Sequence, residues 1–432
     1  MNKNRVVKNA SWIIGIQIVK SLLGLIISML TARFLGPSDF GLINYAASIV
    51  TFVSPIMYLG VNSILVREIV DLPEREGETL GTAITMSLLS SVFCILGIFA
   101  FASLVNRGEK ETVIVCSLYS VLLIFQALEM IMYWFQAKLK AKYTSVVALA
   151  AYAVVSAYKI FLLATGKNIR WFALSNALDY MLIAFSLLVI YNIIGAQKLS
   201  FSFKAAKRLL NTGKYYIISN LMITVFSQTD RIMLKLMIND SETGFYSAAV
   251  TCAGMTGFVF TAIIDSFRPL IFDYKKTDEI HYEKSIVSLY SLVIYLSLLQ
   301  SVAFTVLAPL IISILYGSAY TASIRALQII VWYCTFSYLG GARDIWILAE
   351  NKQRHLLMIN AVGAVMNIAL NYVLIPFFGA CGAALASVAT QLFINYIFVL
   401  IYKPTRRNGI LQVYALNPKN LMPILNVIRK RN

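Results

Sequence analysis

Residues 11–66 read SWIIGIQIVKSLLGLIISMLTARFLGPSDFGLINYAASIVTFVSPIMYLGVNSILV, and this stretch decides the fold. Two apolar runs, 12–35 and 41–66, flank a short polar turn that begins at Pro37. A transmembrane helix needs about 20 residues, because each residue advances the helix by ~1.5 Å through a hydrocarbon core of ~30 Å. Each run is therefore long enough to cross a bilayer, and a charged residue, Lys20, lies inside the first one.

The composition extends this conclusion to the whole chain. Of 432 residues, 59% are hydrophobic and 13% are charged, with a mean hydropathy of +0.75. Soluble domains are typically about 45–50% apolar and about 25% charged. The sequence therefore predicts an all-α polytopic membrane protein, in which the excess of basic residues reports orientation in the membrane. No nucleic-acid partner is expected.

The sequence offers no pattern typical of catalysis. The five cysteines lie in apolar runs without metal-ligand spacing, and the two histidines, His281 and His355, lie in polar loops. No phosphate-binding loop of the GKS/T type is present. The N-terminal apolar run is too long for a signal peptide and lacks a small-residue cleavage site, so it is predicted to be an uncleaved span. We expect no enzymatic activity, no metal site and no cofactor.

Twelve apolar segments are predicted to span the membrane. They are 12–35, 41–66, 79–105, 112–136, 144–165, 171–194, 214–238, 244–267, 285–315, 322–348, 356–377 and 380–402. Counting lysines and arginines with a cytoplasmic N-terminus places 26 on the cytoplasmic side, seven on the opposite side and four inside the membrane. This bias across short loops is a strong positive-inside signal, so both termini are predicted to be cytoplasmic.

A weak internal repeat divides the chain into two halves. The segment that begins at Gly41 is echoed by the segment that begins at Gly244. The segment 135–137, which precedes a basic loop, is echoed by 349–351, and the segment 172–175 is echoed by 384–387. Because each half has an even number of spans, the repeats are parallel, as in transporters whose halves are related by an axis along the membrane normal. We predict two six-helix bundles around a central cleft, over 1–205 and 206–402. A basic tail, 403–432, would be interfacial or solvated in the cytoplasm.

Ionisable groups inside the spans point to the protein interior, because exposing them to lipid costs ~2.5–3.5 kcal/mol each. Lys159 and Asp179 lie at matching depths on neighbouring spans and are predicted to form a structural ion pair; a role in coupling is the alternative. Glu129 is either a protonated, buried carboxylic acid or part of a proton relay.

Two adjacent charged pairs, Asp230-Arg231 and Arg343-Asp344, allow one member of each to pair laterally while the other faces the cleft, since neighbours on a helix point ~100° apart. If the arginines and Lys20 face the cleft, they form a cationic lumen suited to an anionic substrate. The alternatives are that each arginine is locked to a local carboxylate and that Lys20 extends toward the cytoplasmic interface.

Four stretches resemble one family of membrane proteins. TARFLGPSDFG with the helix that follows it (31–45) resembles the first hairpin of Wzx-type (RfbX-like) polysaccharide and O-antigen flippases. YLGVNSILVRE (58–68), TDRIMLKLMINDSETGFYSAA (229–249) and LAPLIISILYGSAYTASIRALQII (307–330) are similar to later segments of that family, in the same order. The similarity covers nearly the whole chain.

The resemblance implies the fold of the multidrug/oligosaccharidyl-lipid/polysaccharide exporter (MOP) superfamily, which is MATE-like. It also implies the task of moving an undecaprenyl-pyrophosphate-linked oligosaccharide across the bacterial inner membrane for O-antigen, capsule or exopolysaccharide synthesis. Membrane lipids, a polysaccharide polymerase and a chain-length regulator are the partners it suggests. On this interpretation Lys20, Arg231 and Arg343 bind the pyrophosphate, and Glu129, Asp230 and Asp344 serve orientation or coupling to H⁺ or Na⁺.

Other functions remain open. A cation-coupled exporter of amphipathic drugs would favour acidic lumen residues, and a lipid II flippase would often carry two further C-terminal helices. A membrane-embedded transferase would need catalytic groups on a large outer loop, which this sequence lacks.

Polar residues in the spans, Gln126 among them, would line a sugar path or bond between helices. Gly and Pro residues would permit bending during alternating access, at Pro55, Gly254, Gly257, Gly340, Gly341 and Gly363.

Overall fold

Helices account for the regular structure of this chain. The computed structural model describes residues 3–194 and 197–421, and all regular elements in these two ranges are helical. Within them, seven helices are long and apolar enough to cross a membrane, or eight if one bent pair counts as a single span. The predicted class, an all-helical multi-pass membrane protein, is confirmed. The helices α9 (Phe203–Met237) and α13 (Ser323–Ala349), which match the predicted spans 214–238 and 322–348, are outside this count.

The chain forms two compact units, residues 1–236 and 237–432. The helix α9 (Phe203–Met237) therefore belongs almost entirely to the first unit; the division at 205/206 predicted from the repeat falls within its first turn and stays a prediction. Contacts of its first turns explain this grouping. Arg208 forms an ion pair of 2.9 Å with Glu68, and the backbone at Gly213 approaches Gly60 so closely that neither position has room for a Cβ atom.

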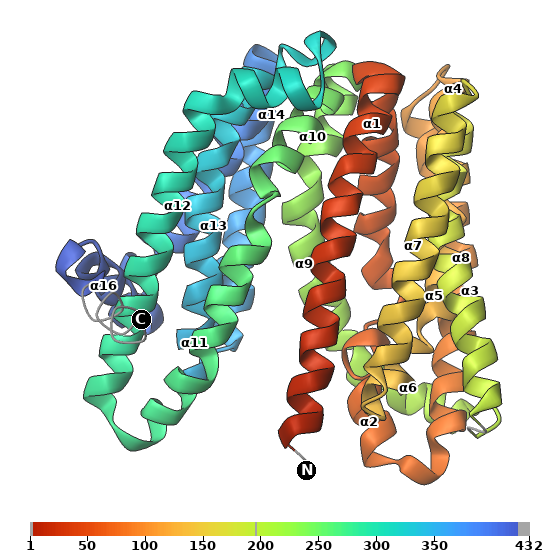
Figure 1. Ribbon diagram of the computed structural model, residues 1–432, viewed down its shortest axis with the longest axis horizontal. Coiled ribbons are helices and arrows are strands. Elements are labelled where there is room, and N and C mark those ends of the chain that lie inside the picture. The colour runs from red at the N-terminus through yellow and green to blue at the C-terminus, as the bar shows by residue number, and fades with distance from the viewer. Residues whose placement is uncertain (1–2, 195–196, 422–432) are drawn as a thin grey trace. The chain divides into compact units, whose positions relative to one another are not determined.

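The first unit is built from nine helices and two short 3₁₀ turns in the described part of the chain. They are α1 (Lys3–Met57), η1 (Val61–Ser63), α2 (Leu65–Asp71), η2 (Pro73–Arg75), α3 (Glu76–Val105), α4 (Lys110–Ser120), α5 (Leu122–Glu129), α6 (Met132–Ala137), α7 (Ala141–Ala164), α8 (Ile169–Ile193) and α9. The helix α7 packs along α1 and α8, and α5 packs along α8 (Figure 1).

The turn predicted after residue 35 is present as a break inside α1. A straight helix of 55 residues would be about 80 Å long, far more than one bilayer crossing needs. Gly36 interrupts it with φ 76° and ψ 173°, a backbone conformation open to glycine because it has no Cβ atom. The following Pro37 has no amide proton to donate, so the helix restarts there. Figure 1 shows the ribbon of α1 as two rods joined by this bend.

The second unit repeats this device. Its elements are α10 (Asp240–Gly254), α11 (Gly257–Thr277), α12 (Glu279–Leu315), η3 (Ser318–Tyr320), α13 (Ser323–Ala349), α14 (Arg354–Leu392), the π-helix η4 (Phe393–Ile397), α15 (Phe398–Ile401), η5 (Lys403–Thr405), α16 (Arg406–Ala415) and η6 (Pro418–Leu421). Gly379, with φ 51°, breaks α14 between the two predicted spans, and Glu242 Oε2 accepts a hydrogen bond of 2.6 Å from Ala380 N just after the break.

The glycines expected to permit bending lie in two different settings, and bending during transport stays a prediction. The helices α10 and α11 meet at 42° across Gly254–Gly257. By contrast, α13 runs unbroken through Gly340 and Gly341, and α14 through Gly363. Gly340 serves packing instead, because a Cβ atom there would lie 2.7 Å from Asn395 Oδ1. A glycine in an apolar helix thus allows either a bend or a close approach, which the sequence alone does not distinguish.

The described part of the tail is a packed element and not a loose solvated segment. The helix α16 lies against α12, where Ser291 Oγ donates to Ala415 O at 2.8 Å. Asn408 and Gln412 are fully buried, and Asn408 donates to the hydroxyl of Tyr290. The tail's predicted position relative to the membrane stays a prediction.

Candidate functional site

Two adjoining polar cavities lie among the membrane helices of the first unit. Their volumes are about 230 and 220 Å³, and both are lined by Tyr119, Tyr152, Lys159 and Asn176. The polar side chains of the first cavity come from α1, α4, α5, α7 and α8: Thr51, Ser54, Tyr119, Gln126, Tyr152, Lys159, Asn176, Asp179 and Tyr180. Each volume is suited to one small polar group, such as a phosphate or part of a sugar.

The charge in this site is held by local hydrogen bonds. Lys159 Nζ donates to Asn176 Oδ1 at 3.0 Å, and Asn176 Nδ2 donates to Phe172 O at 2.9 Å, which fixes the orientation of the amide. Asp179 follows Asn176 by three positions on α8, so both side chains share a face of that helix. Asp179 is close enough to act electrostatically on Lys159. The two predicted partners therefore line one cavity; a direct ion pair between them stays a prediction.

Glu129 lies at the last position of α5, beside this cavity. Its carboxyl group acts electrostatically on Tyr58, Tyr133 and Tyr180, and Tyr180 also lines the cavity. A ring of phenols can donate hydrogen bonds to a carboxylate or pass protons along, so the structure is compatible with both roles considered for Glu129. A relay through it stays a prediction.

Arg343 has partners within the second unit. Its guanidinium donates to Asp344 Oδ1 through Nη2 at 2.8 Å and to Asn395 Oδ1 through Nη1 at 2.7 Å, and the residue is only 4% exposed. Asn395 lies on the π-helix η4, and its amide donates to Gln391 and to Phe336 O. This geometry favours the alternative in which the arginine is locked to a local carboxylate. Its assignment to pyrophosphate stays a prediction.

The remaining predicted residues lie on α9 and α1. Asp230 is 5% exposed, and Arg231 Nη1 donates to Gln228 Oε1 at 3.3 Å on the same helix. The side chain of Lys20 lies outside the described ones. A cationic lumen formed by Lys20, Arg231 and Arg343 is therefore still a prediction.

Sequence reasoning missed a second buried cation. Lys235 is one of the seven basic residues predicted on the side of the membrane opposite the termini; its side chain is 5% exposed, and its Nζ lies 2.6 Å from Glu109 Oε2. Thr112 Oγ1 also donates to Glu109 Oε2, at 2.7 Å. The hydrogen bond from Lys235 holds the pKa of Glu109 below its usual value. The signal that could have found it is spacing, since Lys235 follows Arg231 by one helical turn on α9.

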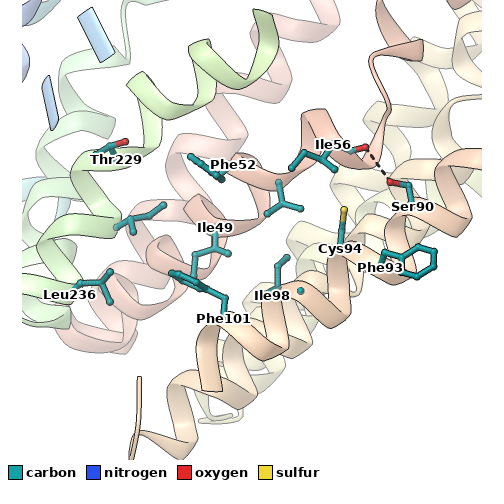
Figure 2. A pocket seen from close by; sticks show the side chains of 13 residues that line it. Ile49, Phe52, Ile56, Ser90, Phe93, Cys94, Ile98, Phe101, Thr229 and Leu236 are labelled. Atoms are coloured by element: carbon teal, nitrogen blue, oxygen red, sulfur yellow. Dashed lines mark hydrogen bonds between the residues drawn. The ribbon is translucent and has the colours of Figure 1, made fainter. Parts of the chain in front are cut away.

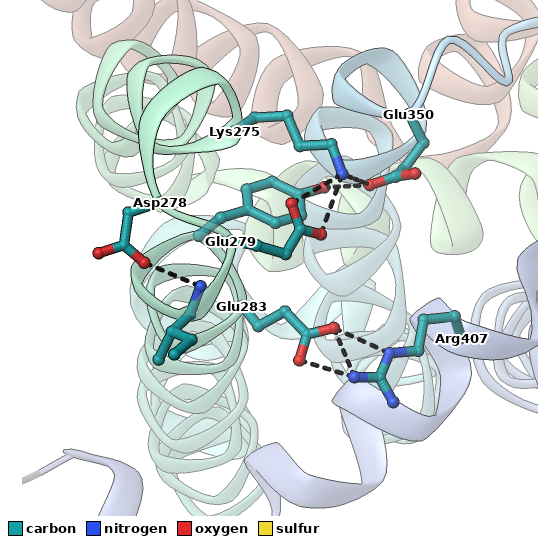
Figure 3. Close-up of polar contacts among 8 residues, drawn as sticks. Lys275, Asp278, Glu279, Glu283, Glu350 and Arg407 are labelled. Atoms are coloured by element: carbon teal, nitrogen blue, oxygen red, sulfur yellow. Dashed lines mark hydrogen bonds and ion pairs between the residues drawn. The ribbon is translucent and has the colours of Figure 1, made fainter.

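Other charged residues form ion pairs that connect helices of the second unit. At the end where α11 meets α12, Lys275 pairs with Glu350 at 2.6 Å and with Glu279 at 3.1 Å, and Arg407 of α16 binds Glu283 (Figure 3). These pairs join α11, α12, α13 and α16. Among the described residues no group of histidine, cysteine, aspartate or glutamate side chains could hold a metal ion.

The sequence is similar to those of several known membrane proteins. A family model described as "Polysaccharide biosynthesis protein" matches residues 6–275. The chain is 27% identical over 267 residues to an uncharacterized membrane protein of Methanocaldococcus jannaschii, covering 58% of this chain and 50% of that protein, so it spans about half of that relative's length. It is 21% identical over 415 residues to a putative O-antigen transporter of Escherichia coli, covering 93% and 98% of the two chains.

Two solved structures share the fold. A lipid II flippase, MurJ, in an inward closed conformation matches with a TM-score of 0.76 at 14% identity, covering 93% of this chain and 90% of that one. An inward-facing multidrug resistance MATE family transporter of the MOP superfamily matches with a TM-score of 0.69 at 15% identity, covering 91% and 95%. Identities this low show the fold alone, and they confirm the MATE-like architecture.

Proposed function

This chain belongs to the polysaccharide biosynthesis protein family, and we propose that it moves a lipid-linked oligosaccharide from one face of a cell membrane to the other. In the finer form of the proposal, the substrate is linked to undecaprenyl pyrophosphate. The membrane is the bacterial inner membrane, with both termini cytoplasmic. Twelve spans in two parallel six-helix halves would alternate access to a central cleft. The product would feed O-antigen, capsule or exopolysaccharide synthesis, with a polymerase and a chain-length regulator as partners.

The observation that carries this proposal is the polar cavity around Lys159. A lysine among membrane helices is costly unless it is functional or well paired. Here its ammonium group is accompanied by phenols, amides and hydroxyls, which are the groups that bind phosphate oxygens and sugar hydroxyls. A wholly apolar ligand would leave these donors and acceptors without partners.

The predicted pyrophosphate ligands are part of the same proposal. Lys20, Arg231 and Arg343 would supply further cations during transport, and Glu129, Asp230 and Asp344 would orient them or couple the cycle to H⁺ or Na⁺. For Arg343 this requires that its bonds to Asp344 and Asn395 open.

The proposal is tested by the lipid-linked intermediates of the native host. Lys159, Lys20, Arg231 and Arg343 are replaced one at a time by glutamine, and membrane levels are checked. Lys167→Gln, at an exposed loop position, is the matched control. We expect Lys159→Gln at normal membrane level to reduce surface polysaccharide and to accumulate sugar-lipid on the cytoplasmic face, while Lys167→Gln behaves as wild type.

A second candidate function is cation-coupled export of small amphipathic molecules. The observation in its favour is Asp179, an acidic residue in the same cavity as Lys159. If Asp179→Asn abolishes drug resistance while every lysine variant leaves surface polysaccharide unchanged, the exporter function replaces the flippase function.

A further inference from the structure

An apolar groove runs between α1, α3 and α9 of the first unit. Its volume is about 690 Å³, within the range of about 300–1,000 Å³ typical of ligand pockets. Figure 2 shows the walls, which include Phe52 on α1, Phe93 and Phe101 on α3, and Leu236 on α9. This groove is separate from the polar cavities and shares no lining residue with them.

The groove has a closed floor and an open side. Ile49, Cys94 and Ile98 at its floor are 4%, 7% and 2% exposed, whereas Phe93 at its edge is 73% exposed. Phe93 lies on a helix that is long and apolar enough to cross a membrane, where an exposed apolar side chain is suited to contact with lipid. A chain could therefore enter the groove sideways from the bilayer.

The lining offers no hydrogen bonds to a ligand. Its hydroxyl groups are used internally, since Ser90 Oγ donates to Ile56 O at 3.1 Å (Figure 2) and Thr229 Oγ1 donates to Val225 O at 2.5 Å. A sugar or a polar drug would lose its hydrogen bonds to water here without replacement. The chemistry of the lining selects a hydrocarbon chain.

A cation lies beside one end of the groove. Leu236 lines the groove, and the preceding residue, Lys235, pairs with Glu109, which is itself half exposed. Glu109 lies four residues after the last residue of α3, and Phe101, near that end of the helix, lines the groove. An anionic headgroup at this position could take the place of the Glu109 carboxylate on Lys235, with its chain lying in the groove.

We propose that this groove holds the polyprenyl chain of the lipid-linked substrate, with the phosphate groups near Lys235. The proposal rests on the function proposed above and names a site for the part of the substrate that the polar cavities do not accommodate. Lipid tails are as apolar as the groove, so burial from water supplies no preference between them. Occupancy is set by packing against the aromatic walls and by the tethering of the chain to a phosphate held at Lys235.

The experiment uses the full chain in lipid nanodiscs with a photoreactive probe. The probe is undecaprenyl pyrophosphate with a diazirine in its isoprenoid chain, and labelled residues are mapped by mass spectrometry. Gly97→Phe fills the groove, since a Cβ atom at Gly97 would meet no atom within 4 Å. Leu96→Phe is the matched control, because Leu96 is its neighbour on α3, is 59% exposed and lies outside the lining.

We expect labels on residues that line the groove, competed by unlabelled undecaprenyl pyrophosphate and not by phosphatidylglycerol. Gly97→Phe should reduce labelling by at least about fivefold, and Lys235→Gln should reduce it too, while Leu96→Phe leaves it unchanged. Equal competition by phosphatidylglycerol, or full labelling of Gly97→Phe, would overturn the proposal. Saturable labels elsewhere in the chain would reject the groove alone, whereas the absence of saturable labelling anywhere would reject the flippase function as well.

Discussion

At the scale of single residues, the main lesson is that charges inside the membrane are held by partners close by in the fold. Their presence could be predicted from the sequence, because lysine, arginine and acidic residues interrupt apolar runs. Their partners could not, because the bond from Lys159 to Asn176 and the bond from Arg343 to Asn395 depend on how helices rotate against each other. Asn176 and Asn395 carry no charge, so nothing in the sequence distinguishes them from other polar residues in the spans.

Arg343 gives the first prediction. We expect Arg343→Ala to destabilise the protein by about 3–5 kcal/mol, because removing one member of a buried polar network leaves its other members unpaired. The measurement is the unfolding transition in detergent. An unchanged transition combined with loss of transport would instead assign Arg343 to the substrate.

Glu109 gives a prediction about pH. Its pKa is lowered in the folded protein by Lys235, so its contribution to stability is complete above the unfolded value, about 4.5. That contribution is lost as the pH falls through the lower, folded value. We expect the melting temperature of wild type to fall more than that of Glu109→Gln between pH 7 and pH 4. Parallel pH profiles for the two proteins would show that the ion pair adds nothing to stability.

At the scale of elements, the helix breaks were predictable where glycine and proline stand together in a polar turn. The stretch at Gly36 and Pro37 is such a place. The break at Gly379 was predictable as a gap between two apolar runs, but its cap was not, because Glu242 is distant in sequence. Its carboxylate accepts from Ala380 N, one of the amide groups that a helix start leaves without a partner.

Glu242 therefore offers a prediction at this scale. We expect Glu242→Ala to lower stability by about 1–3 kcal/mol, because a buried backbone amide loses its acceptor. Glu242→Gln should retain most of the stability of wild type, since the oxygen of its side-chain amide can still accept the hydrogen bond from Ala380 N. Thermal unfolding of both variants distinguishes the loss of the acceptor from the loss of the charge, and equal destabilisation would contradict this account.

The packing of residues 197–202 against α3 gives another prediction at this scale. A Cβ atom at Gly81 would lie 2.6 Å from the backbone of Ser200, whereas one at Gly97 of the same helix would touch nothing within 4 Å. We expect Gly81→Ala to increase protease cleavage near residues 197–202, while Gly97→Ala matches wild type. Cleavage that rises equally in both variants, or in neither, would contradict a docked segment.

At the scale of the whole molecule, composition and charge distribution predicted a multi-pass helical membrane protein, and four local motifs indicated its family. Both conclusions are confirmed. They could be predicted because hydropathy and turn chemistry are local properties, which can be read from a short stretch of sequence. Which unit α9 joins was not predictable in this way. It depends on contacts such as Arg208 with Glu68 and the close approach of Gly60 to Gly213, which only the folded chain brings together.

The central claim is that this chain transports a lipid-linked oligosaccharide by means of the polar cavity around Lys159. It is tested most directly in proteoliposomes loaded with a sugar-labelled undecaprenyl-pyrophosphate oligosaccharide, by the rate at which inner-leaflet label becomes accessible to an external glycosidase. We predict that wild type and Lys167→Gln expose this label, and that Lys159→Gln at equal reconstitution slows the exposure at least about tenfold. If wild type exposes the label no faster than protein-free liposomes, or if Lys159→Gln matches wild type, the claim is wrong.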